Sequence, residues 1–155
     1  MTTRRAFLAL ACGAYAAAAP AQLPSNIAAL RAKALQQAVA KVVGGATVRR
    51  GRVKLDLPPL IENGNTVPLS VTVESPMTPA DHVKAIHVFT EKNPQPNVVS
   101  VHLGPRAGRA VITTRARIAD SGTVLAVAQM SDGSFWSGSM NVIVTLSACL
   151  EDGLI

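Results

Sequence analysis

Apolar and polar residues alternate along most of the chain beyond residue 45, and this two-residue period limits the fold more than any other feature of the sequence. Successive side chains of a β-strand point to opposite faces, so each alternating run predicts a strand with one buried face. The runs are VKLDL, VPLSVTV, AIHVF, VVSVHL, RAVITTRARI, TVLAVAQM and SMNVIVTL, and turn-forming segments separate them. About seven short strands spaced in this way predict a mostly β fold, an immunoglobulin-like antiparallel β-sandwich.

One stretch follows a helical period instead. In SNIAALRAKALQQAVAKVV, residues 25–43, apolar side chains recur at intervals of three and four residues, and Gly44 and Gly45 follow. We therefore expect one N-terminal amphipathic helix, whose apolar stripe packs either on the sheet or on a partner chain.

The first residues are typical of an export signal. Arg4 and Arg5 precede a short apolar run and then small residues, the arrangement of the twin-arginine route that exports folded bacterial proteins. The run is shorter than the ~20 residues that cross a bilayer, and Ala9 stands where lipidation of Cys12 would call for Leu. We expect a periplasmic protein with no membrane attachment. The expected divisions are a twin-arginine signal peptide over 1–21, a helical segment over 22–45, and a sandwich with a cysteine-bearing tail over 46–155.

The charge and the cysteine content argue against some classes of function and favour others. Without residues 1–21, Lys plus Arg falls from 15 to 13 against 9 Asp plus Glu, so the formal charge falls from +6 to +4. Basic residues are spread along the chain and aromatic residues make up only 3%, which argues against a nucleic-acid binder. Of the two cysteines only Cys149 remains, so no internal disulfide is expected, and an unpaired thiol in an oxidising compartment indicates an intermolecular or reactive role.

The alternation of the last run predicts the direction of Cys149. Met140, Val142, Val144, Leu146 and Ala148 would face the core, and Asn141, Ile143, Thr145, Ser147 and Cys149 would face away from it. Ile143 on the outward set implies that a partner surface or the helix covers it. The alternative is that Cys149 is a small buried hydrophobic residue at the strand end. Glu151 and Asp152 would disfavour its thiolate form, so nothing local makes it an enzymatic nucleophile.

Histidine and methionine side chains suit copper, and the candidates are His82, His87, His102 and Met77. No H-x-H or C-x-x-C spacing accompanies them, so we predict no metal site and no cofactor. His87 and His102 would face outward on their strands.

Arginines form two groups in the sequence: Arg49, Arg50 and Arg52, and Arg115 with Arg117. Each group is either simply solvated or a docking surface for an acidic partner. Salt dependence of the association with such a partner would separate the two alternatives. Trp136 is expected to anchor the core.

Several segments together resemble the SoxY family, the carrier subunits of a periplasmic sulfur-oxidising system. They are ENGNTVPLSVTVESPMT, IHVFTEKNPQPNVVSVHLGP, GRAVITTRARIADSGTVLAVAQMSDGSFW and VIVTL with a cysteine shortly after it. The resemblance implies an immunoglobulin-like subunit that forms a heterodimer with a SoxZ-like subunit. It also implies that Cys149 carries the substrate: the SoxXA cytochrome joins thiosulfate to the thiol, the SoxB hydrolase releases sulfate, and SoxCD-type enzymes also dock. The carrier itself would not be an enzyme.

The residues around Cys149 depart from the family pattern, which ends in Gly-Gly-Cys-Gly-Gly. Ser147 and Ala148 precede the cysteine, and Leu150 and five further residues follow it. Glycine gives such an arm its conformational freedom and its narrow width. The departure leaves two hypotheses: a covalent carrier whose tail is trimmed or folds aside, or a SoxY-like structural or binding subunit in which Cys149 is a bystander. A thiol enzyme or metal-binding module is a third, more remote class.

Overall fold

One long helix and nine strands make up residues 25–146, the part of the chain that the structure, a computed structural model, describes. Helix α1 spans Ser25–Val43, the residues for which the helical period predicts it. The strands are β1 (Val48–Arg50), β2 (Val53–Asp56), β3 (Leu60–Asn63), β4 (Val67–Val73), β5 (Val83–Thr90), β6 (Asn97–His102), β7 (Val111–Ala116), β8 (Gly122–Met130) and β9 (Phe135–Leu146), and one 3-10 turn, η1 (Pro105–Ala107), follows β6.

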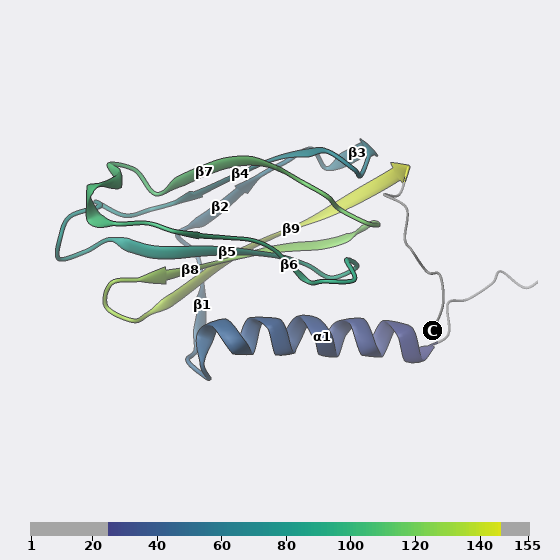
Figure 1. Ribbon diagram of the computed structural model, residues 1–155, viewed down its shortest axis with the longest axis horizontal. Coiled ribbons are helices and arrows are strands. Elements are labelled where there is room, and N and C mark those ends of the chain that lie inside the picture. Colours follow the sequence, from purple (N-terminus) through teal and green to yellow (C-terminus); the bar gives the residue numbers. More distant parts are fainter. Residues whose placement is uncertain (1–24, 147–155) are drawn as a thin grey trace, which may run out of the picture.

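The strands form a two-sheet sandwich, which confirms the predicted fold class. The larger sheet has the order β1-β9-β8-β5-β6, with β3 also paired to β9, and the smaller sheet has the order β2-β4-β7. The pairs are antiparallel, except that β1 and β3 run parallel to β9. Figure 1 shows α1 running along the larger sheet, on the side away from β2, β4 and β7.

Alternating apolar residues fill the space between the sheets, as the two-residue period predicts. On β4, Val67, Leu69, Val71 and Val73 are at most 4% exposed, while the residues between them are half-buried or exposed. They pack with apolar side chains of the larger sheet, among them Val142 of β9, in one continuous core. Burial of this apolar surface is the main force that holds the two sheets together.

A second, smaller core lies on the outer face of the larger sheet, beneath α1. Phe89, Val127 and Phe135 are buried there, and the helix contributes Leu35, Ala38, Val39, Val42 and Val43. The apolar stripe of the helix therefore packs on the chain's own sheet, one of the two positions that the sequence left open.

Strand β9 has neighbours on both edges. Strand β8 pairs with one edge, while β1 pairs with residues 135–137 and β3 with residues 143–146 of the other. Between these two segments the chain passes from β1 to β2 close to Gly138, where a Cβ atom would overlap the carbonyl oxygen of Val53. A residue without a side chain is therefore required at this crossing of the two sheets.

Two details differ from the sequence-based expectations. The sandwich has nine strands in its described residues rather than about seven, because β1 and β3 are short and the alternation does not mark them. Leu146, predicted to face the core, is 61% exposed, because β9 runs past Val144, the last buried residue on that face.

Candidate functional site

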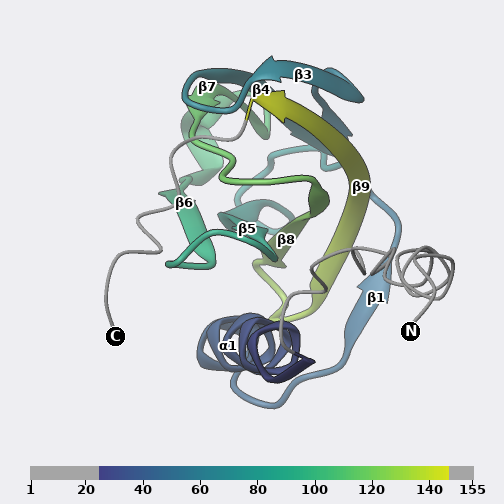
Figure 2. The same ribbon diagram turned by 90° about the vertical axis from the view of Figure 1, so that its right-hand side faces the viewer.

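The end of β9 is the candidate site, because Cys149 follows it closely in the sequence. The strand is hydrogen-bonded as far as its last residue: the amide of Gly64 donates to the carbonyl oxygen of Leu146 at 3.1 Å, and the amide of Ile118 donates to the carbonyl oxygen of Gly64 at 2.8 Å. The hydroxyl of Thr145 lies within 3.4 Å of the carbonyl oxygens of Ile61 and Glu62. Leu146, the last residue of β9, is therefore held in place at the end of the sandwich where β3 and β9 lie side by side (Figure 2).

Ser121 extends the ladder between β8 and β9 with its side chain. The amide of Val144 donates to the Ser121 hydroxyl oxygen at 2.8 Å, and the hydroxyl donates back to the carbonyl oxygen of Val144 at 3.3 Å. Strand β8 itself begins only at Gly122. The Ser121 hydroxyl thus takes the place of one backbone pair in the ladder between β8 and β9. The sequence pattern DSG predicted only a turn here.

Three exposed apolar side chains surround the end of β9: Leu60 at 56%, Ile143 at 61% and Leu146 at 61% exposure. Leu60 and Ile143 are directly paired across β3 and β9. The outward direction predicted for Ile143 is confirmed, as it is for Asn141 and Thr145. Helix α1 does not cover Ile143, which leaves a partner surface as the remaining sequence-based explanation.

The cysteine itself and the residues beside it lie outside the described part of the chain. These are Ser147, Ala148, Cys149 and Leu150. Their predicted roles as attachment point and flanking arm therefore stay predictions.

The structure brings two of the three histidines together. The rings of His87 and His102 lie 6.0 Å apart, centroid to centroid, in an edge-on arrangement. His87 faces outward from the sandwich as predicted, but it is only 8% exposed rather than open to solvent. Its Nδ1 lies 2.8 Å from the hydroxyl of Ser100. Burial, and after it the neighbouring His102, holds the pKa of His87 below its ordinary value of 6.5.

The other copper candidates lie elsewhere. Nδ1 of His82 lies 3.2 Å from the carbonyl oxygen of Thr78. Met77 is 6% exposed, and its sulfur accepts a hydrogen bond from the amide of Val83. Among residues 25–146, no group of three or more His, Cys, Asp or Glu side chains is placed to hold a metal ion. No described helix has the length and apolar character needed to cross a bilayer.

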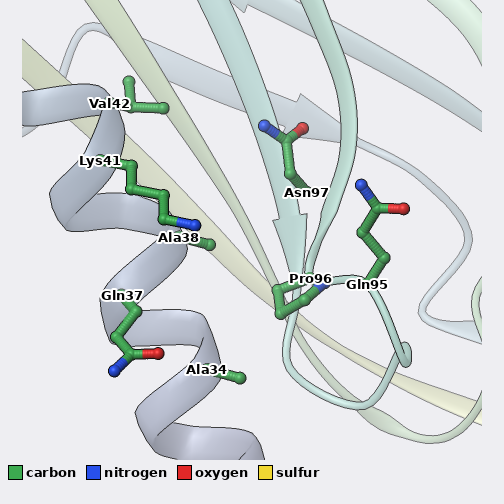
Figure 3. A pocket seen from close by; sticks show the side chains of 8 residues that line it. All are labelled: Ala34, Gln37, Ala38, Lys41, Val42, Gln95, Pro96 and Asn97. Carbon is green, nitrogen blue, oxygen red and sulfur yellow. The ribbon is translucent and has the colours of Figure 1, made fainter.

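A cleft of about 390 Å³ separates α1 from the connection between β5 and β6 (Figure 3). Lys41 and Gln37 line it from the helix, and Gln95 and Asn97 line it from the other side. The other lining residues are Ala34, Ala38, Val42 and Pro96. The cleft offers amides and one ammonium but no nucleophile or carboxylate, so the residues that line it do not form a catalytic set.

The arginines are exposed, in agreement with the sequence. Arg115 lies on β7, and Arg117 follows that strand directly. Arg49 and Arg52 lie over the ring of Trp136, and Arg50 is paired with Ser137. Trp136 is half-buried and packs against the main core. Trp136 therefore anchors the core as expected, but it also contributes to the surface.

The fold and the site define a class: an immunoglobulin-like sandwich with one helix, whose last strand ends at a fixed point shortly before a cysteine. The family model for the sulfur oxidation protein SoxY matches residues 39–149, so its match ends on Cys149. The chain belongs to the SoxY family. This confirms the resemblance seen in the sequence.

Solved structures support the same assignment. The sulfur carrier protein SoxY from Chlorobium limicola f thiosulfatophilum is 27% identical with a TM-score of 0.62, and the match covers 74% of this chain and 99% of that one. The search of curated proteins finds no match.

Superoxide reductases share the fold alone. Neelaredoxin from Ignicoccus hospitalis is 17% identical with a TM-score of 0.54 over 61% of this chain and 80% of that one. A putative superoxide reductase from Thermotoga maritima is 21% identical with a TM-score of 0.52 over 63% of this chain and 87% of that one.

Proposed function

We propose that the protein is a periplasmic covalent carrier of sulfur intermediates, with Cys149 as the attachment point. The observation that supports it best is that the SoxY match extends to Cys149 itself, while β9 is fixed in the sandwich up to Leu146. A carrier has to present its thiol to several enzymes in turn. The fixed end of β9 at Leu146, three residues before Cys149 in the sequence, gives such an attachment point an origin that the sandwich holds in place.

The loading step makes one S–S bond and removes two electrons. The thiol of Cys149 loses its proton, its sulfur bonds to the outer sulfur of thiosulfate, and the two electrons pass to a SoxXA-like cytochrome. Hydrolysis by a SoxB-like enzyme then breaks the bond between that sulfur and the sulfonate group and releases sulfate, so one sulfur atom stays on the cysteine. SoxCD-type enzymes would act on that atom. The carrier contributes the thiol and performs no turnover of its own.

The proposal includes a heterodimer with a SoxZ-like subunit. The paired side chains of Leu60 and Ile143 support it, since two large apolar residues at about 60% exposure lie side by side on one surface. Apolar side chains at such positions are typical of an interface core. The partner would thus cover the outer face of β3 and β9.

Export by the twin-arginine route is also part of the proposal. The support for it is the pair Arg4 and Arg5 directly before an apolar run. This route exports chains that have already folded, which suits a subunit that leaves the cytoplasm with its partner.

The intact mass of the purified protein tests the carrier function. The protein and its partner subunit are incubated with thiosulfate and the loading cytochrome, and the mass is compared with and without a thiol reductant. A reductant-labile adduct that is absent from Cys149→Ser supports the carrier. An unmodified thiol in a heterodimer that still forms would show that the protein is a structural or binding subunit. That second function is favoured by the Ser-Ala-Cys-Leu sequence in place of glycines.

A further inference from the structure

Two arginines and a tryptophan form one surface at the beginning of β9. The guanidinium carbon of Arg52 lies 4.8 Å from the centroid of the Trp136 ring, and that of Arg49 lies 5.7 Å from it. Arg50 is the next residue of β1 and pairs with Ser137, so its side chain points to the opposite face of the strand. We call Arg49, Arg52 and Trp136 the Arg–Trp surface. An indole ring attracts cations to its face, so it holds both charges in place.

The backbone also fixes these side chains. Gly51 has φ of 120° and Arg52 has φ of 57°, a left-handed conformation that side-chain-bearing residues seldom adopt. Hydrogen bonds hold both residues of the turn: the amide of Gly51 donates to the carbonyl oxygen of Ser137 at 3.0 Å, and the amide of Glu74 donates to that of Arg52 at 2.8 Å. A conformation of this kind persists only where its surroundings impose it. The turn thus directs the guanidinium of Arg52 over the indole.

The positive charge of this surface is not neutralised within the described chain. Arg49, Arg50 and Arg52 make no ion pair with any carboxylate in residues 25–146. The charge of Arg52 acts on Asp132, whose pKa is lowered first by hydrogen bonds from Ser134 and to a lesser degree by this charge. Two guanidinium groups on one ring, with no ion pair to a described carboxylate, leave an excess of positive charge.

Beside the Arg–Trp surface, toward the other face of β1, a shallow hollow of about 320 Å³ adjoins Arg50. Gly51, Val53, Leu125, Ser137, Gly138 and Ser139 complete its lining. Ser139 is exposed and its hydroxyl has no partner among the described residues. Guanidinium and hydroxyl donors on its wall are the groups that hydrogen-bond to carboxylates.

We propose that the Arg–Trp surface docks the acidic face of a partner protein. Arginine and tryptophan are the residues most enriched at the energetic centres of protein interfaces, and planar guanidinium groups bind carboxylates with two parallel hydrogen bonds. The surface is too compact for a nucleic acid, which needs a longer basic track with several stacking rings. It also has no cluster of apolar side chains for insertion into a membrane. An acidic protein surface is the occupant whose size and charge fit.

The position of the surface leaves the end of β9 open. Trp136 and Leu146 are ten residues apart on one strand, a separation of about 33 Å at ~3.3 Å per residue. A partner held at the Arg–Trp surface would therefore not need to contact Leu146, the last residue of β9. The docking proposal holds whether or not Cys149 carries sulfur.

Binding of a fluorescently labelled octaglutamate peptide to the full chain tests the proposal by polarisation. Trp136 is the only tryptophan of the protein, so its fluorescence reports whether the peptide binds beside it. At low ionic strength we expect binding that changes this fluorescence and that weakens as salt is raised to physiological strength, where the screening length is ~8 Å. Arg49→Gln and Arg52→Gln should each weaken binding about 2- to 5-fold, and Arg52→Lys should weaken it less than Arg52→Gln.

Arg115→Gln is the matched control, because it removes one exposed positive charge on β7. It should leave the affinity unchanged within about 1.5-fold, and thermal unfolding should show that all variants fold. Absence of peptide binding, an equal loss in Arg115→Gln, or an unchanged Trp136 signal on binding would each overturn the proposal. So would tighter binding to phosphatidylglycerol vesicles or to single-stranded DNA than to the peptide.

Discussion

Replacing Gly138 with alanine should destabilise the fold at the point where the two sheets cross. An added Cβ would overlap the carbonyl oxygen of Val53 and lie 3.0 Å from its carbonyl carbon. Both atoms belong to the backbone, so no side-chain rotation relieves the overlap. Val53 is held in turn by its pairing with Val73 in the smaller sheet. To accept the methyl group, β2 has to move away from β9.

The expected loss follows from two opposing terms. Overpacking of this kind costs about 1 to 3 kcal/mol. Replacing glycine also restricts the unfolded chain, which returns about 0.4 to 1 kcal/mol. With the middle of each range, the net loss in the free energy of unfolding is about 1.3 kcal/mol, which lowers the melting temperature of a domain of this size by roughly 3 to 8 °C.

Two other glycines provide a graded comparison in urea and thermal unfolding. A Cβ at Gly104 meets nothing within 4 Å, and its φ of −106° suits any residue, so Gly104→Ala should be neutral or slightly stabilising. A Cβ at Gly122 lies 3.1 Å from Cγ of Lys92, a flexible side chain that can move. Stability should therefore fall in the order Gly104→Ala, Gly122→Ala, Gly138→Ala. A Gly138→Ala protein as stable as the Gly104→Ala protein would refute the steric argument.

Three further changes test other contacts. Burial and His102 lower the pKa of His87 in the folded protein, so the unfolded chain takes up a proton first as the pH falls below about 6.5, and the free energy of unfolding should fall with pH in that range. His87→Gln should reduce this pH dependence in urea unfolding at about pH 7.5 and 5.5, and an unchanged difference between the two pH values would contradict the prediction. Ser121→Ala should reduce the free energy of unfolding by about 1 to 2 kcal/mol, because it removes the two hydrogen bonds between the Ser121 hydroxyl and the backbone of Val144. A loss below ~0.3 kcal/mol in urea unfolding would show that these hydrogen bonds do not stabilise the fold. Ile143→Thr should change the free energy of unfolding of the isolated chain by less than ~0.5 kcal/mol, since the side chain is 61% exposed. It should nevertheless weaken the proposed SoxZ-like heterodimer in analytical ultracentrifugation, and an unaltered heterodimer would place the interface elsewhere.

The two-residue period was enough to predict the sandwich and most of its core. It correctly assigned Val142 and Val144 to the buried face of β9, and Ile143 to the outer face, because hydrophobic burial on a pleated strand alternates strictly. It failed at Leu146, since a strand can continue past the layer that buries it and the sequence does not show where that layer ends.

Side-chain roles that depend on contacts distant in the sequence were harder to predict. His87 looked exposed because it stands between apolar residues on an outward face, but side chains on the same face, those of Phe89, Ser100 and His102, lie against its ring. The crossing at Gly138 could not be predicted, because it depends on β1 and β2 belonging to different sheets. The arginine cluster was visible in the sequence, whereas the indole beneath it lies more than eighty residues later in the chain.

In the proposed carrier, the contacts that hold β9 up to Leu146 on its β3 edge and up to Val144 on its β8 edge limit how far a cargo on Cys149 could travel. Only three residues, 147 to 149, separate that last fixed carbonyl from the sulfur-bearing position. Three fully extended residues span at most about 10 Å. Any enzyme that acted on such a cargo would therefore need its reaction centre within about 10 Å of the surface that meets the sandwich. The whole sandwich, rather than a long tether, would have to turn from one enzyme to the next.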